Sequence, residues 1–466
     1  MAGTVIIREY FHNTRRPFRL TLAGENLYVL TSPHDVAAAY KETESLTFDQ
    51  FIRDIMVAFG ASPGAIEKMW LLPSNDKHGF NTQVKNPSQK SLAQLTRDFH
   101  KQQLHPGQNQ RSLSVKFQDY IDESLRWDSM SIKLNDKYTL RSSEMSKDIW
   151  LKGWCADVLL NAATRAFYGE SLLQNQPDLF REFFDFDDNS WMLMYRYPRF
   201  MASSMYQAKD AAIDALTQYF ATPKGSRRGE AWFIRTLEAE QRQLGIGDRD
   251  IATLSLMVYW VVNSNTYKLC FWILTYLLHD STLLALIREE TSHAFTTTGE
   301  LSMTFLLDSC VRLNCLFDEV LRITNSSSSV RSVVSDTIIG DFVLRSGAKV
   351  LIPYRQLHFD EAIFGTNAQE FDSGRFLRQR NLHQSPNYRP FGGGSTYCPG
   401  RFIARQEVVA FVAFVLKRFE LEIPNAEKDG IPNTFPRLEE MKPCLGVMGP
   451  VQGNDLIVRI KRRMCT

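Results

Sequence analysis

One short loop, residues 390–401, constrains this chain of 466 residues more than any other stretch. Its sequence, PFGGGSTYCPGR, places Cys398 among glycines, and an apolar pattern of helical period follows at once. Glycines permit left-handed backbone and let the chain approach a flat ligand closely. A thiolate in the first turn of a helix is stabilised by the free N–H groups and the dipole there. The loop therefore predicts a metal held by a single sulfur, and a buried cysteine in a glycine-rich turn is the alternative.

The composition permits one large apolar core and argues against a nucleic-acid partner. Hydrophobic residues make up 44% of the chain, and 54 lysines and arginines nearly balance 52 aspartates and glutamates. A protein that binds phosphate backbones usually has a marked basic excess. The seven cysteines are scattered and contain no CxxC pair. This pattern predicts free thiols in a reducing compartment, with neither a disulfide framework nor a zinc site.

The hydrophobic periodicity predicts a mainly α fold with small β-sheets near both ends of the chain. Residues 49–306 have a mostly helical pattern, and a helix is expected to end near Ile323. Nothing in the composition marks a domain linker, so we expect a single domain over residues 1–466. Strands are predicted at residues 18–22, 27–30, 330–334, 337–343, 349–352, 447–450 and 456–460. The first two are expected to form one hairpin and the last two another.

The longest apolar stretch, residues 254–278, predicts one continuous buried helix. Its length would also suit a membrane span. However, Asn263, Ser264, Asn265 and Lys268 interrupt its middle, and such a polar cluster is strongly unfavourable at the centre of a bilayer. We therefore expect a central helix of the core.

Two charged residues on an apolar helix precede the cysteine loop. Glu319 and Arg322 lie three residues apart and share a helix face, a pairing that by itself is common on solvated helices. Arg375 follows in the segment EFDSGRF, between that helix and Cys398. The order and spacing of these four residues resemble the cytochrome P450 family. In that family a glutamate–arginine–arginine network ties the cysteine loop to the core.

The loop carries the rest of the resemblance, through the spacing Phe391-x-x-Gly394-x-x-x-Cys398-x-Gly400. The resemblance covers the chain from roughly residue 17 to its C-terminus. It implies the cytochrome P450 fold, haem b (iron protoporphyrin IX) as the cofactor, and Cys398 as the ligand of the iron. It also implies that Phe391, Gly394 and Gly400 contribute to the cofactor site.

The residues that meet the haem propionates depart in part from the family pattern. The family often places an arginine on a propionate nine residues beyond the second residue of the Glu–Arg pair, and Arg331 occupies that position. Two residues before the cysteine the family usually has arginine or histidine, whereas this chain has Thr396, which donates one neutral hydrogen bond. Propionate charge must then be met by Arg331, because guanidinium–carboxylate pairing suits the task. Lys101 and His100 are weaker candidates, since both could equally be surface residues.

Pro399 is a second departure. In this family, backbone N–H groups just after the cysteine usually point at its sulfur and moderate its charge. Proline has no N–H, so one donor is missing. We therefore expect the thiolate of Cys398 to push more electron density toward the iron.

The helix predicted at residues 254–278 should cross over the haem. In the family an acid–threonine pair on this helix helps to deliver protons during oxygen activation. In this chain Ser264 stands at the acid position, Asn265 at the alcohol position and Thr266 directly after, and these three are the candidate catalytic residues. An asparagine here resembles the branch with prostacyclin synthase and sterol 7-alpha-hydroxylase, which contains both monooxygenases and enzymes that rearrange peroxides. We expect Asn265 to order a water that delivers protons.

The substrate pocket is expected to be apolar. Residues 183–205 are rich in aromatic residues and methionines, which predicts a mobile lid over a lipophilic ligand, with plain core packing as the alternative. The pocket is expected to be lined by Val262, Asn265, Ser328, Val330, Val447 and Met448.

The resemblance implies a monooxygenase that hydroxylates or otherwise oxidises a lipophilic small molecule, such as a terpenoid, steroid or polycyclic natural product. It would use O2 and electrons from NADPH–cytochrome P450 reductase, as a fungal natural-product or steroid-oxidising member would. Two alternatives stay open: a redox-partner-independent isomerase or dehydratase of a peroxide, and a non-catalytic haem sensor or binding protein. Fungal and animal members usually carry an N-terminal membrane anchor, which this chain lacks. We expect that it was removed, and that the full-length form lies on the cytoplasmic face of the endoplasmic reticulum membrane.

Overall fold

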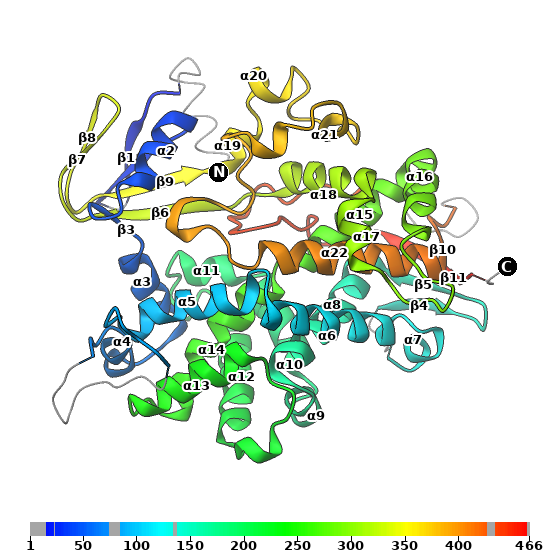
Figure 1. Cartoon of the computed structure of the whole chain (residues 1–466), viewed down its shortest axis with the longest axis horizontal. Helices are drawn as coiled ribbons and strands as arrows, with labels where there is room; N and C mark the ends of the chain where they lie inside the picture. Colours follow the sequence, from blue (N-terminus) through cyan, green and yellow to red (C-terminus); the bar gives the residue numbers. More distant parts are fainter. Residues whose placement is uncertain (1–14, 23, 74–83, 134–137, 426–433, 464–466) are drawn as a thin grey trace.

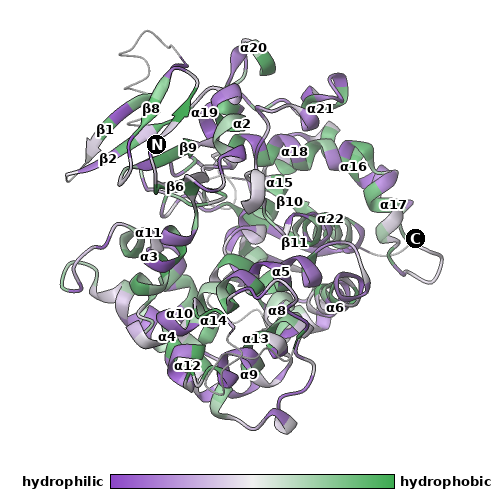
Figure 2. Cartoon of the chain, turned by 60° about the vertical axis from the view of Figure 1, so that its left-hand side comes forward, coloured by the Kyte–Doolittle hydropathy of each residue, from purple (hydrophilic) through white to green (hydrophobic). Residues whose placement is uncertain are grey.

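The computed structural model describes residues 15–463, apart from residue 23 and the segments 74–83, 134–137 and 426–433. The fold is mainly helical with small sheets, as predicted. Helices fill the middle and lower part of Figure 1, and the sheets lie at the edges. In Figure 2 hydrophobic residues gather on inner helices such as α14, while many outer segments are hydrophilic.

The helices account for most of residues 49–306, as the periodicity predicts. α8, α15 and α22 pack on one another, and most of their residues are buried, which is typical of helices at the centre of a core. The bounds of the helices are α2 Pro33–Lys41, α3 Asp49–Phe59, α4 Pro63–Met69, α5 Leu92–Leu104, α6 Gln108–Ser124, α7 Trp127–Lys133, α8 Leu151–Tyr168, α9 Ser171–Asn175, α10 Leu179–Asp187, α11 Ser190–Met194, α12 Ser203–Ala221, α13 Trp232–Gln243, α14 Asp248–Asn263, α15 Thr266–His279, α16 Ser281–Ser292, α17 Met303–Asp308, α18 Val311–Thr324, α19 Tyr354–His358, α20 Glu361–Phe364, α21 Arg375–Arg378 and α22 Arg401–Arg418.

Two sheets lie at opposite sides of the molecule (Figure 1). One has the strand order β1-β2-β9-β6-β3, and the other has the order β10-β11-β5-β4. The predicted N-terminal hairpin and the strands predicted at 330–334 and 349–352 are confirmed. The single strand predicted at 337–343 is wrong: the chain turns at Gly340, which has φ +58°, and β7 pairs with β8 as a hairpin. The bounds of the strands are β1 Phe18–Leu22, β2 Glu25–Val29, β3 Leu46–Thr47, β4 Thr139–Ser142, β5 Ser146–Trp150, β6 Ser328–Val333, β7 Thr337–Ile339, β8 Phe342–Leu344, β9 Lys349–Pro353, β10 Phe419–Glu422 and β11 Ile457–Arg462.

The predicted C-terminal hairpin is wrong. β11 pairs with β10 and β5, whereas Val447 forms an isolated bridge with Asn325, and Pro450 forms one with Leu438. The apolar residues of β11 become buried between those two strands. Because β5 lies about 300 residues earlier in the chain, local alternation could predict the strand but not its partners.

The continuous helix predicted for residues 254–278 is also wrong. α14 ends at Asn263 and α15 begins at Thr266, so that Ser264 and Asn265 form a break between them. The Asn265 side chain is hydrogen-bonded to Ser264 and to the backbone of Val447. Short polar side chains that find partners of this kind compete with the helical ladder.

Within the described part of the chain, no single helix is long and apolar enough to cross a membrane. Residues 248–279 and 281–292 have the length and apolar composition of a membrane span only when they are taken together. The chain bends by 119° between these two segments. Most residues of the first segment are buried in the core.

A buried network joins α18 to the segment that precedes the cysteine loop. The Glu319 carboxylate accepts hydrogen bonds from Arg322 Nη2 at 2.8 Å, from Arg375 Nε at 3.2 Å and from the backbone N–H of Asp372 at 2.9 Å. Glu319 and Arg322 are fully buried, and Arg375 nearly so. The remaining guanidinium N–H groups bond to backbone carbonyls, including those of His358 and Ala368. Both cations therefore depend on one carboxylate.

We predict that Glu319→Gln destabilises the protein by about 3–5 kcal/mol, because removing one partner of a buried ionic network leaves the other charges uncompensated. Urea unfolding followed by circular dichroism measures the loss. The matched control is Glu361→Gln, which neutralises an exposed carboxylate on α20. Equal stability of the two variants would contradict the prediction.

Candidate active site

A cavity of about 1020 Å³ lies between the break in the long helix and the cysteine loop. Its walls also include parts of α3, α5, α10 and the C-terminal segment 442–453. This volume is at the upper end for small-molecule sites. The cavity can therefore hold a large flat cofactor together with a ligand.

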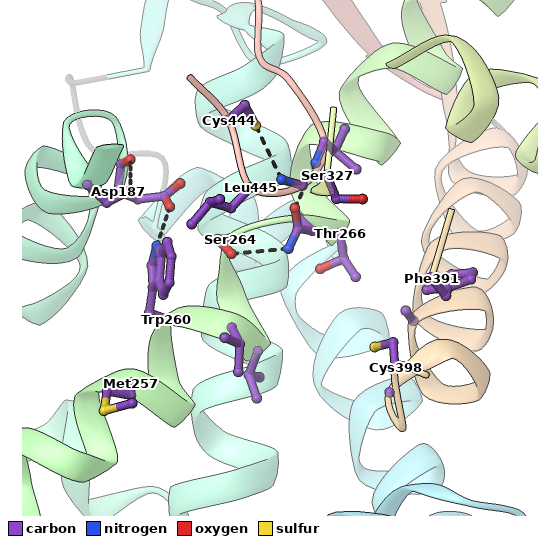
Figure 3. Close-up of a pocket in the computed structure, with 18 of the residues that line it drawn as sticks. Asp187, Met257, Trp260, Ser264, Thr266, Ser327, Phe391, Cys398, Cys444 and Leu445 are labelled. Atoms are coloured by element: carbon purple, nitrogen blue, oxygen red, sulfur yellow. Dashed lines mark hydrogen bonds between the residues drawn. The ribbon is translucent and has the colours of Figure 1, made fainter. Parts of the chain in front are cut away.

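Cys398 lies in the cavity wall, three residues before α22 begins. Figure 3 shows its sulfur pointing into the cavity, across from Thr266. Burial raises the pKa of the Cys398 thiol, while hydrogen bonds from the backbone N–H groups of Gly400 and Arg401 lower it. The N–H of Cys398 itself donates to the carbonyl of Phe391 at 3.0 Å, which closes the loop. Two backbone donors thus reach the sulfur, and Pro399 supplies none.

Gly394 has a packing role in the loop. It has φ +60°, and a Cβ on it would lie 2.6 Å from the Tyr40 ring of α2. Gly394 is not among the residues that line the cavity, whereas Phe391 and Gly400 are. The glycine is needed both for its left-handed backbone and for the close contact with α2.

Arg331 is a buried cation beside the cavity. Its Nη1 donates to Ser329 Oγ at 2.6 Å, and its Nη2 donates to Thr396 Oγ1. Ser329 and Thr396 line the cavity, although Arg331 itself does not. Among the described residues Arg331 forms no ion pair, and burial lowers its pKa. Because a buried cation is costly without an anion, this site fits a carboxylate ligand such as a haem propionate.

The α5 wall holds three further basic residues. His100 Nδ1 donates to the carbonyl of Thr96 at 2.7 Å, and burial lowers the pKa of the His100 imidazole. A neutral imidazole is poorly suited to pair with a propionate. Lys101 lines the cavity and is exposed. Arg97, which the sequence analysis missed, also lines the cavity and is ion-paired with Asp49. Its spacing of four residues from Lys101 places both on one face of α5, a signal that could have found it.

Asn265 is hydrogen-bonded at both ends of its amide. Its Oδ1 accepts the backbone N–H of Val447 at 2.8 Å, and its Nδ2 donates to Ser264 Oγ at 3.2 Å. Asn265 therefore attaches the helix break to the C-terminal segment. Gly446 makes the approach possible, because a Cβ there would lie 1.9 Å from Asn265 Oδ1. A proton-delivering water at Asn265 stays a prediction.

Glu407 is an acidic residue in the cavity wall that the sequence analysis did not select. It lies on α22, nine residues after Cys398, and is 5% exposed. Burial raises its pKa to about 8, and a hydrogen bond with the Thr266 side chain opposes this shift. The signal in the sequence was a single carboxylate directly before the apolar run VVAFVAFVL. Thr266 thus faces an acid on another helix.

The structure places most of the other predicted residues in the cavity wall and one outside it. Val262, Ser264, Ser328, Val447 and Met448 line the cavity, and Val330 does not. The aromatic and methionine-rich segment 183–205 is also divided: Phe183 and Met205 are fully buried, Trp191 lines the cavity, and Phe200 is 83% exposed.

We predict that Gly446→Ala destabilises the protein and weakens ligand binding, because the new Cβ would collide with Asn265. In an Asn265→Ala background the same substitution should cost little, since its collision partner is gone. A double-mutant cycle from urea unfolding measures the difference, which we expect to be about 1–3 kcal/mol. Additive effects of the two substitutions would contradict the contact. Gly225→Ala, at a glycine that has no left-handed φ and no neighbour within 4 Å, reports the effect of a glycine-to-alanine change without a collision.

Fold and site together place a cysteine in the wall of a cavity large enough for a flat cofactor. Residues 126–442 match the family model described as cytochrome P450. A cytochrome P450 monooxygenase of Penicillium oxalicum, poxD, is 23% identical over 426 residues, covering 88% of this chain and 81% of that protein. The 25-hydroxycholesterol 7-alpha-hydroxylase of Rattus norvegicus is 25% identical over 398 residues, covering 79% and 91%.

Solved structures agree at the level of the fold. A retinoic acid-bound cyanobacterial P450 matches with a TM-score of 0.69 and 16% identity, covering 98% of this chain and 94% of that one. The haem domain of a P450DA mutant matches with a TM-score of 0.64 and 15% identity, covering 98% and 92%. The chain belongs to the cytochrome P450 family, whose members bind haem b through a cysteine thiolate.

Proposed function

We propose that this chain is a haem-thiolate monooxygenase that oxidises a lipophilic small molecule with O2. The observation that carries the proposal is the Cys398 sulfur, which faces a large cavity at the start of α22 and receives two backbone N–H groups. The names of the fungal relatives, which are monooxygenases, support the reaction class. Residues 1–466 act as one haem domain in this proposal.

The residues around the cavity fit haem b as the cofactor. Cys398 would hold the iron, with Phe391 and Gly400 beside it, and Thr396 and Arg331 would meet a propionate. Arg97 and Lys101 lie on α5 as cations for the other propionate. When bound, the haem supplies the oxygen-activating chemistry. The protein residues bind it, orient it and shield it from water.

The break in the long helix would serve proton delivery. Ser264 and Thr266 line the cavity opposite Cys398, and Thr266 is hydrogen-bonded with Glu407. A carboxyl whose pKa is about 8 is mostly protonated at pH 7, so the Thr266 hydroxyl has a proton donor beside it. Asn265 would act by fixing the position of the break.

The substrate we propose is a terpenoid, a steroid or a polycyclic natural product of secondary metabolism. Support comes from the size of the cavity and from its apolar wall, which includes Ile55, Met257, Val258, Val262 and Leu269. Relatives that carry the names of steroid and 25-hydroxycholesterol hydroxylases are consistent with this class. The fungal relatives favour a natural product.

Electrons would come from NADPH–cytochrome P450 reductase, with the enzyme at the cytoplasmic face of the endoplasmic reticulum membrane. Support for a membrane contact comes from exposed apolar side chains between α11 and α12, namely Tyr195, Phe200 and Met201, which are 63%, 83% and 59% exposed. Arg196, in the same segment, is ion-paired with Asp54 of α3 at 3.6 Å. An exposed apolar patch of this kind suits a lipid surface.

The carbon monoxide difference spectrum of the reduced protein tests the cofactor assignment. We expect an absorbance band at about 450 nm, which is typical of haem with thiolate ligation. We expect this band to be lost in Cys398→Ser. Cys444→Ser is the matched control, since Cys444 also lines the cavity and its removal should leave the band unchanged. A band that survives in Cys398→Ser would overturn the assignment.

Turnover conditions test the reaction class. Oxidation that requires NADPH, the reductase and O2 identifies a monooxygenase. Conversion of a hydroperoxide without electron donors would identify an isomerase or dehydratase instead. Ligand binding without any turnover, across a panel of terpenoids and steroids followed by mass spectrometry, would identify a sensor.

We predict that Pro399→Leu raises the reduction potential of the haem, because the new backbone N–H adds a third donor to the sulfur and lowers its charge. A spectroelectrochemical titration measures the potential. Pro399→Ala restores the same N–H with a smaller side chain and should shift the potential in the same direction. An unchanged or lowered potential in both variants would contradict the prediction.

A further inference from the structure

A buried ion pair interrupts the apolar wall of the cavity. Lys268 Nζ, at the start of α15, donates to Asp187 Oδ2, at the end of α10, over 2.8 Å. Lys268 is 9% exposed and Asp187 is 7% exposed, and both line the cavity. Burying such a pair is often no more stable than burying apolar residues of the same size. A pair at this place therefore points to a role beyond packing.

Asp187 uses more of its hydrogen-bonding capacity than Lys268 does. Asp187 accepts from the Tyr267 hydroxyl at 3.0 Å and from Trp260 Nε1 at 3.0 Å, in addition to Lys268. The ammonium of Lys268 has three N–H donors, and Asp187 is its one hydrogen-bond partner among the described residues. Two donors thus remain at the cavity wall. A ligand that covers them without offering an acceptor would leave them unsatisfied, which weakens binding.

The local charges decide which acceptor fits. Asp187 and Asp188 both act on Lys268 and raise its pKa, so Lys268 is a full cation that already has a carboxylate partner. Lys152 pairs with Asp188 at 3.1 Å. The two lysines and the two aspartates therefore leave no excess of positive charge. An anionic ligand would therefore approach two carboxylates. A neutral oxygen atom can accept the free N–H groups without that repulsion.

The position of the pair relative to Cys398 defines its use. In Figure 3 Asp187 and Trp260 lie on the opposite side of the cavity from Cys398. A ligand held there by its polar end would direct another part of its skeleton toward the cysteine. The same arrangement would fix the orientation of an otherwise apolar molecule, which dispersion contacts alone do not do.

We propose that Lys268 is a substrate-anchoring residue, and that the substrate carries a neutral oxygen acceptor, a ketone, lactone carbonyl or hydroxyl, on the end of its lipophilic skeleton that rests against α10 and α15. This inference rests on the proposed function and specifies the substrate class of the same cavity. Sites built to hydrogen-bond a polar group discriminate strongly against analogues that lack it.

Imidazole-tethered alkanes test the proposal without knowledge of the natural skeleton. The imidazole binds the haem iron and gives an absorbance change, while the tail extends into the cavity. The probes are 1-alkylimidazoles with tails of about eight, ten and twelve carbons, a length range chosen for a cavity near the upper size class. Each length is made with a terminal methyl, hydroxyl, methyl ketone or carboxylate group. Dissociation constants are taken from the absorbance titrations.

The variants separate the anchor from the stability of the fold. Lys268→Met alone would leave Asp187 unpaired, so the main variant is Asp187→Asn/Lys268→Met, in which both groups are neutral. The asparagine Oδ1 can still accept from Trp260 Nε1, and its Nδ2 can donate to the Tyr267 hydroxyl, which is able to accept. Lys268→Arg keeps the charge and the donors. Lys152→Met is the matched control, because it removes the other lysine of the cavity wall that is ion-paired to an aspartate.

At one or more tail lengths we expect the hydroxyl and ketone probes to bind the wild type at least about tenfold more tightly than the methyl probe, which corresponds to about one lost hydrogen bond. The preference should vanish in the double variant and persist in Lys268→Arg and Lys152→Met. Equal affinities for all tails in the wild type, or a preference that survives in the double variant, would overturn the proposal. Tightest binding of the carboxylate would also overturn it, in favour of an anion site. Absence of any imidazole spectrum would instead count against the haem site itself.

Discussion

The Glu319 carboxylate is the point on which the geometry of the site depends. It is fully buried and compensates two guanidinium groups, Arg322 and Arg375. Arg322 also donates to the carbonyl of His358 at 2.9 Å, and the ring of His358 accepts the backbone N–H of Arg389 at 3.0 Å. A short series of hydrogen bonds thus leads from α18 to the residue before the cysteine loop. Burial lowers the pKa of His358 to about 3, so this ring remains a neutral acceptor at any working pH.

The opposite wall is organised by a break in a helix. Asp187 receives hydrogen bonds from Trp260 on α14 and from Tyr267 and Lys268 on α15, so one carboxylate joins both halves to α10. Asn265 attaches the same break to the segment 444–448. Two of the polar residues that argue against a membrane span, Asn265 and Lys268, thus find partners in other parts of the chain. Their common effect is to expose Ser264 and Thr266 at the wall of the cavity.

Arg331 and Lys268, two of the cations near the cavity, differ in whether a carboxylate compensates their charge, and this difference assigns them different ligands. Arg331 is buried without an ion-pair partner among the described residues, and its neighbours Ser329 and Thr396 are neutral. It therefore suits an anionic group such as a propionate. Lys268 already has Asp187, so it suits a neutral acceptor. At these two positions the wall thus favours an anion beside Arg331 and a neutral acceptor beside Lys268.

The sequence by itself determined the features that depend on local spacing. The glycines around Cys398, the Glu319–Arg322 pair and Arg375 resemble the P450 family in order and distance, and alternating residues predicted the hairpin of β1 and β2 together with the strands β6 and β9. These features depend on a few neighbouring residues, because periodicity and backbone preferences act over short stretches of the chain. The tertiary structure decided the rest: the break at Ser264 and Asn265, the partners of β11, the acid Glu407 beside Thr266, and the pairing of Lys268 with Asp187. Each of these depends on contacts between segments far apart in the chain, and the burial that gives those side chains their charge and hydrogen-bonding roles exists only once the helices have packed.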